Sequence, residues 1–223
     1  MRIFHEALEK ARFRGVVKKS GFWYVDIPRT GSTAIRENLF EEFGWPHGKT
    51  RTDRLKHKRM HLPAHTPAQT ARSEIGLGLW KELFSFAFVR NPYERFASLF
   101  FHFLRCEKRF NWDFETFVKE LTKFTPITDV ANKPFYAYRQ VDYVMDQQGV
   151  CLLSYVGKYE SRADDILHIR NRLNITMWND EVRAPSIRHN KETHRGMYTS
   201  GTRKTVYEYF RSDFEAFGYS PEL

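Results

Sequence analysis

The chain has 223 residues, 41% of them hydrophobic, and a formal net charge of +9 at pH 7. This length and composition predict one globular domain over residues 1–223, and the charge favours an anionic ligand or partner. Two cysteines are too few for a disulfide framework, no apolar run reaches the roughly 18 residues of a transmembrane helix, and the N-terminus has no signal-peptide pattern. We therefore expect a cytoplasmic protein with no transmembrane segment.

The first predicted strand, Phe22–Ile27, is a run of aromatic and β-branched residues that ends at Pro28. The loop PRTGST follows, and a helical pattern runs over Thr33–Phe43. A strand, a loop of small residues and a helix N-terminus direct backbone N–H groups toward one point, which attracts a phosphate or a sulfate. The loop differs from the P-loop of nucleotide triphosphatases because it has one glycine and its cation, Arg29, precedes that glycine.

The second predicted helix begins at the sequence TPAQ. Thr66 has the features of an N-cap, Pro67 occupies the first helical position, and Gln69 completes a capping box. The segment before this helix contains a dense basic run, Lys49–Arg59. This run has two interpretations, a solvated loop or a cleft that binds an anionic glycan acceptor.

The second predicted strand, Leu83–Val89, ends in Arg90. The corresponding strand of a P-loop ATPase ends in an Asp that holds magnesium, so a cation stands here in place of a metal ligand. Asn91 and Glu94 repeat the start signal of a capped helix, as N-cap and box partner. Ser98 falls on the same helix face as these two, opposite a stripe of phenylalanines, and lies either on an ordinary solvent face or in a binding site. An arginine at each of two strand ends suggests a doubly anionic ligand.

The rest of the chain adds one strand and three helices. The predicted elements are the strand Cys151–Val156 and the helices Asp113–Leu121, Ala163–Leu173 and Thr202–Phe217. Strands that alternate with helices predict an α/β fold with a mainly parallel sheet. Ligands of such sheets bind at the carboxyl ends of the strands, which is where Pro28–Thr33 and Arg90–Asn91 lie.

The two motifs that follow the strands, PRTGST and FVRNPYERFASLF, resemble the cofactor signatures of sulfotransferases that use 3′-phosphoadenosine 5′-phosphosulfate (PAPS). The segment HTPAQTARSEIGLGLWKELFSFAFVRNP is similar to the series of the carbohydrate sulfotransferase branch, and YVGKYESRADDI and YEYFRSDFEAFGY resemble its later blocks. The resemblance covers residues 22–219. It implies a P-loop-like three-layer fold whose mainly parallel central sheet is flanked by helices. It also implies PAPS as co-substrate, adenosine 3′,5′-bisphosphate (PAP) as product and no metal.

The resemblance also implies roles for individual residues. The loop that would hold the 5′-phosphosulfate consists of Arg29, Thr30, Gly31, Ser32, Thr33 and Ala34. Arg90 and Ser98 would hold the 3′-phosphate. Arg29 stands where the family usually has lysine. The substitution keeps a positive charge beside the leaving group but replaces a compact ammonium group with a planar guanidinium.

Sulfuryl transfer to a hydroxyl needs a proton acceptor, and we expect His65 to be this base. It precedes the predicted helix start, where the positive helix end should lower its pKa, and the family register places a catalytic histidine there. His61 or a carboxylate are the alternatives, whereas His102 faces away from the phenylalanine stripe and is expected on the surface. The acceptor oxygen would attack sulfur in line while Arg29 and the loop N–H groups stabilise the departing phosphate oxygen.

The acceptor that the resemblance favours is a carbohydrate hydroxyl, and Ser186–Met197 is a candidate lid over the nucleotide. Family members of the Golgi carry a membrane anchor, so a Golgi location would require that the chain be a trimmed part of a longer protein. Three alternatives stay open. The first is a P-loop kinase-like nucleotide binder, which the missing Gly-Lys-Ser/Thr disfavours, and the second is a basic nucleic-acid-binding domain, for which no groove-reading motif is present. The third is a sulfotransferase fold that has lost its activity and only binds its ligand.

Overall fold

The computed structural model describes residues 2–43, 62–106, 111–122, 138–179 and 191–223. Its sheet has three parallel strands in the order β1 (Phe22–Val25), β2 (Phe84–Val89) and β3 (Tyr155–Lys158). Every residue of β1 and β2 is buried, as expected for a parallel sheet that is covered on both faces. The predicted α/β class with a parallel central sheet is confirmed.

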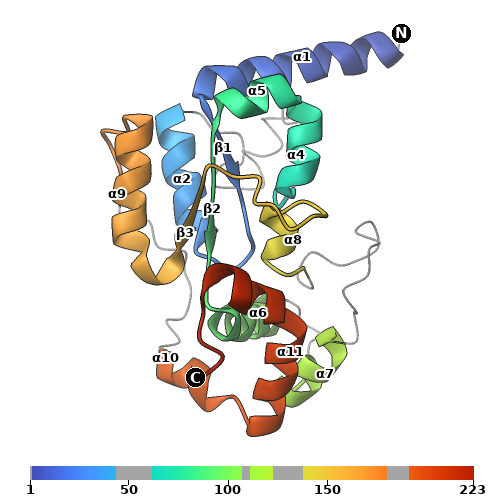
Figure 1. Cartoon of the computed structure of the whole chain (residues 1–223), viewed down its shortest axis with the longest axis vertical. Helices are drawn as coiled ribbons and strands as arrows, with labels where there is room; N and C mark the ends of the chain where they lie inside the picture. The colour runs from blue at the N-terminus through green and yellow to red at the C-terminus, as the bar shows by residue number, and fades with distance from the viewer. Residues whose placement is uncertain (1, 44–61, 107–110, 123–137, 180–190) are drawn as a thin grey trace.

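Helices surround the sheet on both faces and at both ends of its strands (Figure 1). In chain order they are α1 (Arg2–Ser20), α2 (Ser32–Phe43), α4 (Ala68–Ile75), α5 (Leu77–Glu82), α6 (Pro92–Cys106), α7 (Phe114–Thr122), α8 (Val141–Val144), the 3-10 helix η2 (Tyr159–Ser161), α9 (Arg162–Leu173), α10 (Lys191–Gly196) and α11 (Ser200–Phe217). Figure 1 shows α2 and α9 on one face of the sheet and α4 and α8 on the other. The helices α6, α7, α10 and α11 lie beyond the carboxyl ends of the strands.

Two hydrophobic clusters hold this arrangement together. The larger cluster surrounds the sheet and includes Phe13 of α1, whose ring meets Trp23 of β1 edge-on at 5.8 Å between centroids. The smaller cluster joins α6, α7 and α11, where Phe96 packs against Phe117 at 5.1 Å and Phe210 at 5.7 Å. The smaller cluster therefore fixes α6, whose first turn lies at the carboxyl edge of the sheet.

At one end or both, the predicted ranges of the strands and helices differ from the structure by one residue or more, and β1, for example, ends at Val25 rather than Ile27. The third strand covers Tyr155–Lys158 rather than Cys151–Val156, because Cys151 forms an antiparallel bridge with Met145 before the chain joins the sheet. The helix predicted over Asp113–Leu121 is α7, displaced by one residue at each end. Among the described helices, none combines the length and the apolarity that crossing a membrane requires.

The predicted capping box at Thr66 is wrong. Pro67 is the N-cap of α4, and no side chain among the described residues caps this helix end. The hydroxyl of Thr66 donates instead to the carbonyl oxygen of Pro63 at 2.6 Å, so it closes the preceding turn.

The cap at the start of α6 is half confirmed. Asn91 Oδ1 accepts hydrogen bonds from the backbone N–H groups of Tyr93 at 3.0 Å and Glu94 at 3.4 Å, as an N-cap should. The prediction that Glu94 completes a capping box is wrong, because the backbone N–H of Asn91 donates to Glu160 Oε1 at 2.8 Å instead. The Glu94 carboxylate is thereby left to contact other side chains.

Candidate functional site

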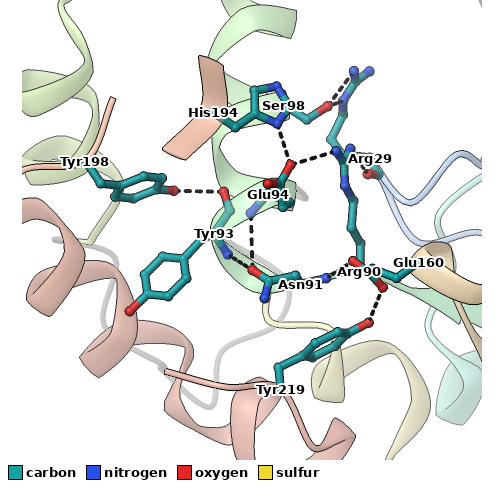
Figure 2. A network of polar contacts seen from close by, with 10 residues as sticks. All are labelled: Arg29, Arg90, Asn91, Tyr93, Glu94, Ser98, Glu160, His194, Tyr198 and Tyr219. Atoms are coloured by element: carbon teal, nitrogen blue, oxygen red, sulfur yellow. Dashed lines mark hydrogen bonds and ion pairs between the residues drawn. The ribbon is translucent and has the colours of Figure 1, made fainter. Parts of the chain in front are cut away.

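The carboxyl ends of β1 and β2 bring the two predicted motifs into contact. The guanidinium of Arg29 donates to Ser98 Oγ from Nε at 3.1 Å and from Nη2 at 2.9 Å, across 69 residues of sequence. Arg90 Nη1 donates to the backbone oxygen of Arg29 at 3.5 Å. Figure 2 shows this chain of contacts. Ser98 is 7% exposed, so it does not lie on an ordinary solvent face.

The loop between β1 and α2 has a tight backbone geometry. Gly31 has a φ of 81°, and a Cβ placed there would come within 2.8 Å of the Tyr159 ring. Arg29 also has a positive φ, 70°, which is unusual for a residue with a side chain and marks local strain. Thr30 is buried and its hydroxyl donates to the carbonyl of Ile27 at 2.9 Å. The loop therefore leads directly into the N-terminus of α2 at Ser32.

Gln140 holds the backbone of Arg90 in place, and the Tyr159 ring stacks on its guanidinium. The side-chain amide of Gln140 bonds both the N–H and the C=O of Arg90, each at 2.8 Å. The guanidinium lies over the Tyr159 ring at 4.4 Å from its centroid and contacts Glu94 Oε2 at 3.2 Å. Arg90 Nε is buried and has no hydrogen-bond partner among the described residues. A buried donor without a partner fits a site that receives an anionic ligand.

Gln140 and Asp213 are structural residues of the site that sequence reasoning missed. Asp213 is fully buried, and its carboxylate accepts the backbone N–H groups of Gln140 and Val141, both at 2.9 Å. Burial raises the pKa of Asp213 to about 6, although the charge of Arg95 and the two backbone donors act in the opposite direction. These contacts connect α11 to the segment that fixes the Arg90 backbone.

Glu94 and His194 form a second connection that the sequence did not reveal. His194 Nδ1 lies 2.6 Å from Glu94 Oε2, and both side chains are less than 10% exposed (Figure 2). Burial raises the pKa of Glu94, but the hydrogen bond from His194 and the charge of Arg90 outweigh it and hold the pKa below its usual value. His194 belongs to the segment predicted as a lid, Ser186–Met197, of which residues 186–190 lie outside the described part of the chain.

His65 lies at the carboxyl end of β1, paired with Asp26. Its Nδ1 is 2.9 Å from the backbone oxygen of Asp26 and 3.4 Å from the carboxylate Oδ1. Because a carbonyl oxygen can only accept, Nδ1 carries a proton, and the lone pair of the neutral ring is on Nε2. That nitrogen is the atom that a general base would use.

The predicted lowering of the His65 pKa is wrong. Burial does lower it, but the hydrogen bond to Asp26 and the charge of that carboxylate outweigh burial, and the pKa is raised above 6.5. The helix end that should have lowered the pKa starts later than predicted, with Pro67 as N-cap. The Asp26 carboxylate also pairs with Arg36 at 3.3 Å. Burial opposes ionisation of Asp26, yet His65 and Arg36 bring its pKa down to about 2.

His102 was expected on the surface, which is wrong. The ring is half-buried, and its Nδ1 lies 3.5 Å from Arg29 Nη1 and 3.4 Å from Arg105 Nη2. Burial and the charges of these two arginines lower the pKa of His102. Because guanidinium groups can only donate, Nδ1 of His102 is the accepting nitrogen and is already occupied. This contact makes His65 the better candidate base of the two, whereas His61 and Lys49–Arg59 lie outside the described residues.

The site lies at the carboxyl edge of the parallel sheet in an α/β protein, where the cationic side chains of Arg29 and Arg90 come together. No group of three or more His, Cys, Asp or Glu side chains that could hold a metal ion occurs within the described residues. The chain matches the family model described as "Sulfotransferase family" over residues 15–220, and it belongs to that family. It is therefore an enzyme of sulfuryl transfer. Comparisons with curated proteins and with solved structures gave no significant match.

Proposed function

We propose that this sulfotransferase moves a sulfuryl group from PAPS to a hydroxyl group of a carbohydrate. The observation that carries the proposal is the contact between the loop and the α6 motif, in which Arg29 reaches Ser98 and Arg90 reaches the backbone of Arg29. Two cationic side chains thus share one edge of the sheet. A nucleotide with phosphates at both ends of its adenosine fits such an arrangement.

The two ends of the donor are proposed to lie on different residues. The 5′-phosphosulfate would lie at the N-terminus of α2, against Gly31 and the loop N–H groups, where the helix end favours an anion. The 3′-phosphate would lie on Arg90, whose buried Nε lacks a partner among the described residues, and on Ser98. The hydroxyl of Ser98 accepts from Arg29 and can still donate its own hydrogen to a phosphate oxygen.

The proposed reaction is an in-line displacement at sulfur. The acceptor oxygen forms a bond to sulfur, the bond between sulfur and the 5′-phosphate oxygen breaks, and its electron pair stays on that oxygen as PAP leaves. His65 Nε2 takes the hydroxyl proton, and Asp26 holds the ring and stabilises its charged form. Arg29 and the loop N–H groups stabilise the charge that develops on the phosphate oxygen.

The carbohydrate acceptor is supported by the similarity of the loop and α6 motifs to the carbohydrate branch and by the net charge of +9, which suits an acidic glycan. The test is transfer of radiolabelled sulfate from PAPS to a panel of polysaccharides, oligosaccharides and small phenols. Label is expected on a carbohydrate, and the His65→Ala variant should transfer far less to the same acceptor. Label that appears only on a phenol would refute the carbohydrate acceptor, whereas the assignment of PAPS as the donor would stand.

A further inference from the structure

The end of the third strand adds a charged side chain that neither the motifs nor the family resemblance assigned. Arg162 is the first residue of α9 and follows β3 through the short 3-10 helix η2. Its Nη1 lies 3.2 Å from the position that a Cβ on Gly31 would take. The guanidinium therefore lies directly against the loop between β1 and α2.

The guanidinium of Arg162 makes no hydrogen bond and no ion pair with the residues that the structure describes, although the side chain is half-buried. The nearby carboxylate of Asp165 is used elsewhere, since it accepts from the backbone N–H of Lys158 and from the hydroxyl of Ser161, both at 2.7 Å. A cation at the first residue of a helix also lies at the positive end of the helix dipole, which is unfavourable. An anion bound at this point would relieve both.

The position of Arg162 beside Gly31 indicates which end of a bound donor this cation would meet. The Tyr159 ring contacts both parts of the site, because its edge would lie 2.8 Å from a Cβ on Gly31 and its centroid lies 4.4 Å from the guanidinium carbon of Arg90. Arg90 itself reaches the loop at the backbone oxygen of Arg29, which its Nη1 meets at 3.5 Å. Arg162 lies at the Gly31 part of the loop, where the 5′-phosphosulfate is proposed to bind.

We propose that Arg162 binds the 5′-phosphosulfate end of the donor and is a third cation of the site. This inference rests on the proposed use of PAPS. Each of the three parallel strands then delivers one arginine at its carboxyl end: Arg29 after β1, Arg90 after β2 and Arg162 after β3. Because the sulfuryl group leaves from this end, Arg162 would stabilise the same phosphate oxygen as Arg29 during transfer.

The contributions of the 5′-phosphosulfate and 3′-phosphate ends of the donor can be separated with ligands that carry only one of them, measured on the full chain. Calorimetry would compare PAP, adenosine 5′-phosphosulfate and adenosine 3′-monophosphate on the wild-type protein and on Arg162→Gln, Arg162→Lys and Arg172→Gln. Arg172 is the matched control, because it lies on the same helix but is exposed and faces the Phe84 ring at 5.5 Å. Thermal unfolding of each variant would confirm that it is folded.

Arg162→Gln should weaken adenosine 5′-phosphosulfate and PAP by about 10- to 100-fold, the range for a lost hydrogen bond to a charged group. Adenosine 3′-monophosphate should change by less than about twofold, Arg162→Lys should recover most of the loss, and Arg172→Gln should bind like the wild type. Unchanged binding of adenosine 5′-phosphosulfate to a folded Arg162→Gln, or an equal loss for the 3′-monophosphate, would overturn the inference and leave the donor assignment standing. A wild-type protein that binds none of the three would contradict the donor assignment and this inference with it.

Discussion

His65 and Asp26 form a pair in which one ring nitrogen meets two oxygens of the same residue. His65 Nδ1 lies 2.9 Å from the Asp26 backbone oxygen and 3.4 Å from its carboxylate, and Asp26 is 3% exposed. The carbonyl fixes the tautomer, and the carboxylate raises the pKa of the ring. The pair therefore leaves the lone pair of the neutral ring on Nε2 and would stabilise an imidazolium, as the proposed role of His65 as the base requires.

Replacement of His65 should remove catalysis and leave nucleotide binding intact. We expect His65→Ala to lower kcat by roughly 100-fold or more, the usual contribution of a general base, with PAP affinity unchanged. The matched variant is His61→Ala, four residues upstream, which should keep most of its activity. Paired turnover numbers on one acceptor decide the matter, and an active His65→Ala beside an inactive His61→Ala would move the base to His61.

The pH dependence of the rate should report the Asp26 carboxylate. His65 acts as a base only when neutral, and Asp26 raises its pKa, so the wild-type rate should rise with pH through a value above 6.5. Asp26→Asn removes the negative charge that stabilises the imidazolium, and the acidic limb should therefore shift to lower pH. The profile of kcat/KM against pH measures this shift. A limb that stays in place would mean that a different group titrates.

Arg90 and Ser98 should act on one phosphate only. Arg90→Ala should weaken PAP by about 2–4 kcal/mol, the scale for an unpaired charge in a site, and Ser98→Ala by about 0.5–1.5 kcal/mol, a single hydrogen bond. Adenosine 5′-phosphosulfate, which lacks the 3′-phosphate, should change little. If calorimetry shows equal losses for both ligands, these residues support the fold and do not bind the 3′-phosphate.

Gly31 should not tolerate even a methyl group. Its φ of 81° disfavours any side chain, and a Cβ would come within 2.8 Å of Tyr159. Gly31→Ala should lower the free energy of unfolding by about 1–3 kcal/mol and weaken PAP binding, because the loop must shift. Gly15→Ala is the control. Gly15 lies in α1 with nothing within 4 Å of an added Cβ, so this change should stabilise the protein by about 0.5–1 kcal/mol. Urea unfolding of both variants would show whether their effects have opposite signs.

Local patterns were sufficient to predict the strands and most of the larger helices. β1 and β2 are continuous apolar runs, and Asn91 caps α6 through bonds to residues two and three positions away. Such signals lie within a few residues of one another and can be read from a single sequence. The boundary of β3 was missed because Cys151 pairs with Met145, a contact that only the folded chain makes.

The partners of the site residues could not be predicted in this way. Asp26 lies 39 residues from His65 and Glu94 lies 100 residues from His194, so no local pattern links them. The direction of the His65 pKa was wrong for this reason, since a distant carboxylate outweighs the local helix end. One signal was available: Asp26 follows the apolar run of β1 directly, and a carboxylate at that position needs a partner once it is buried.

Thermal unfolding with two nucleotides tests most directly whether the cationic strand ends form a PAPS site. PAP in the presence of a chelator should raise the melting temperature, because a ligand at about 100 times its Kd adds about 2.7 kcal/mol of stability. ATP with magnesium should raise it much less, since the described strand end of β2 carries Arg90 where a P-loop ATPase carries its metal-binding carboxylate. A larger increase with ATP and magnesium than with PAP would contradict a PAPS site at these strand ends.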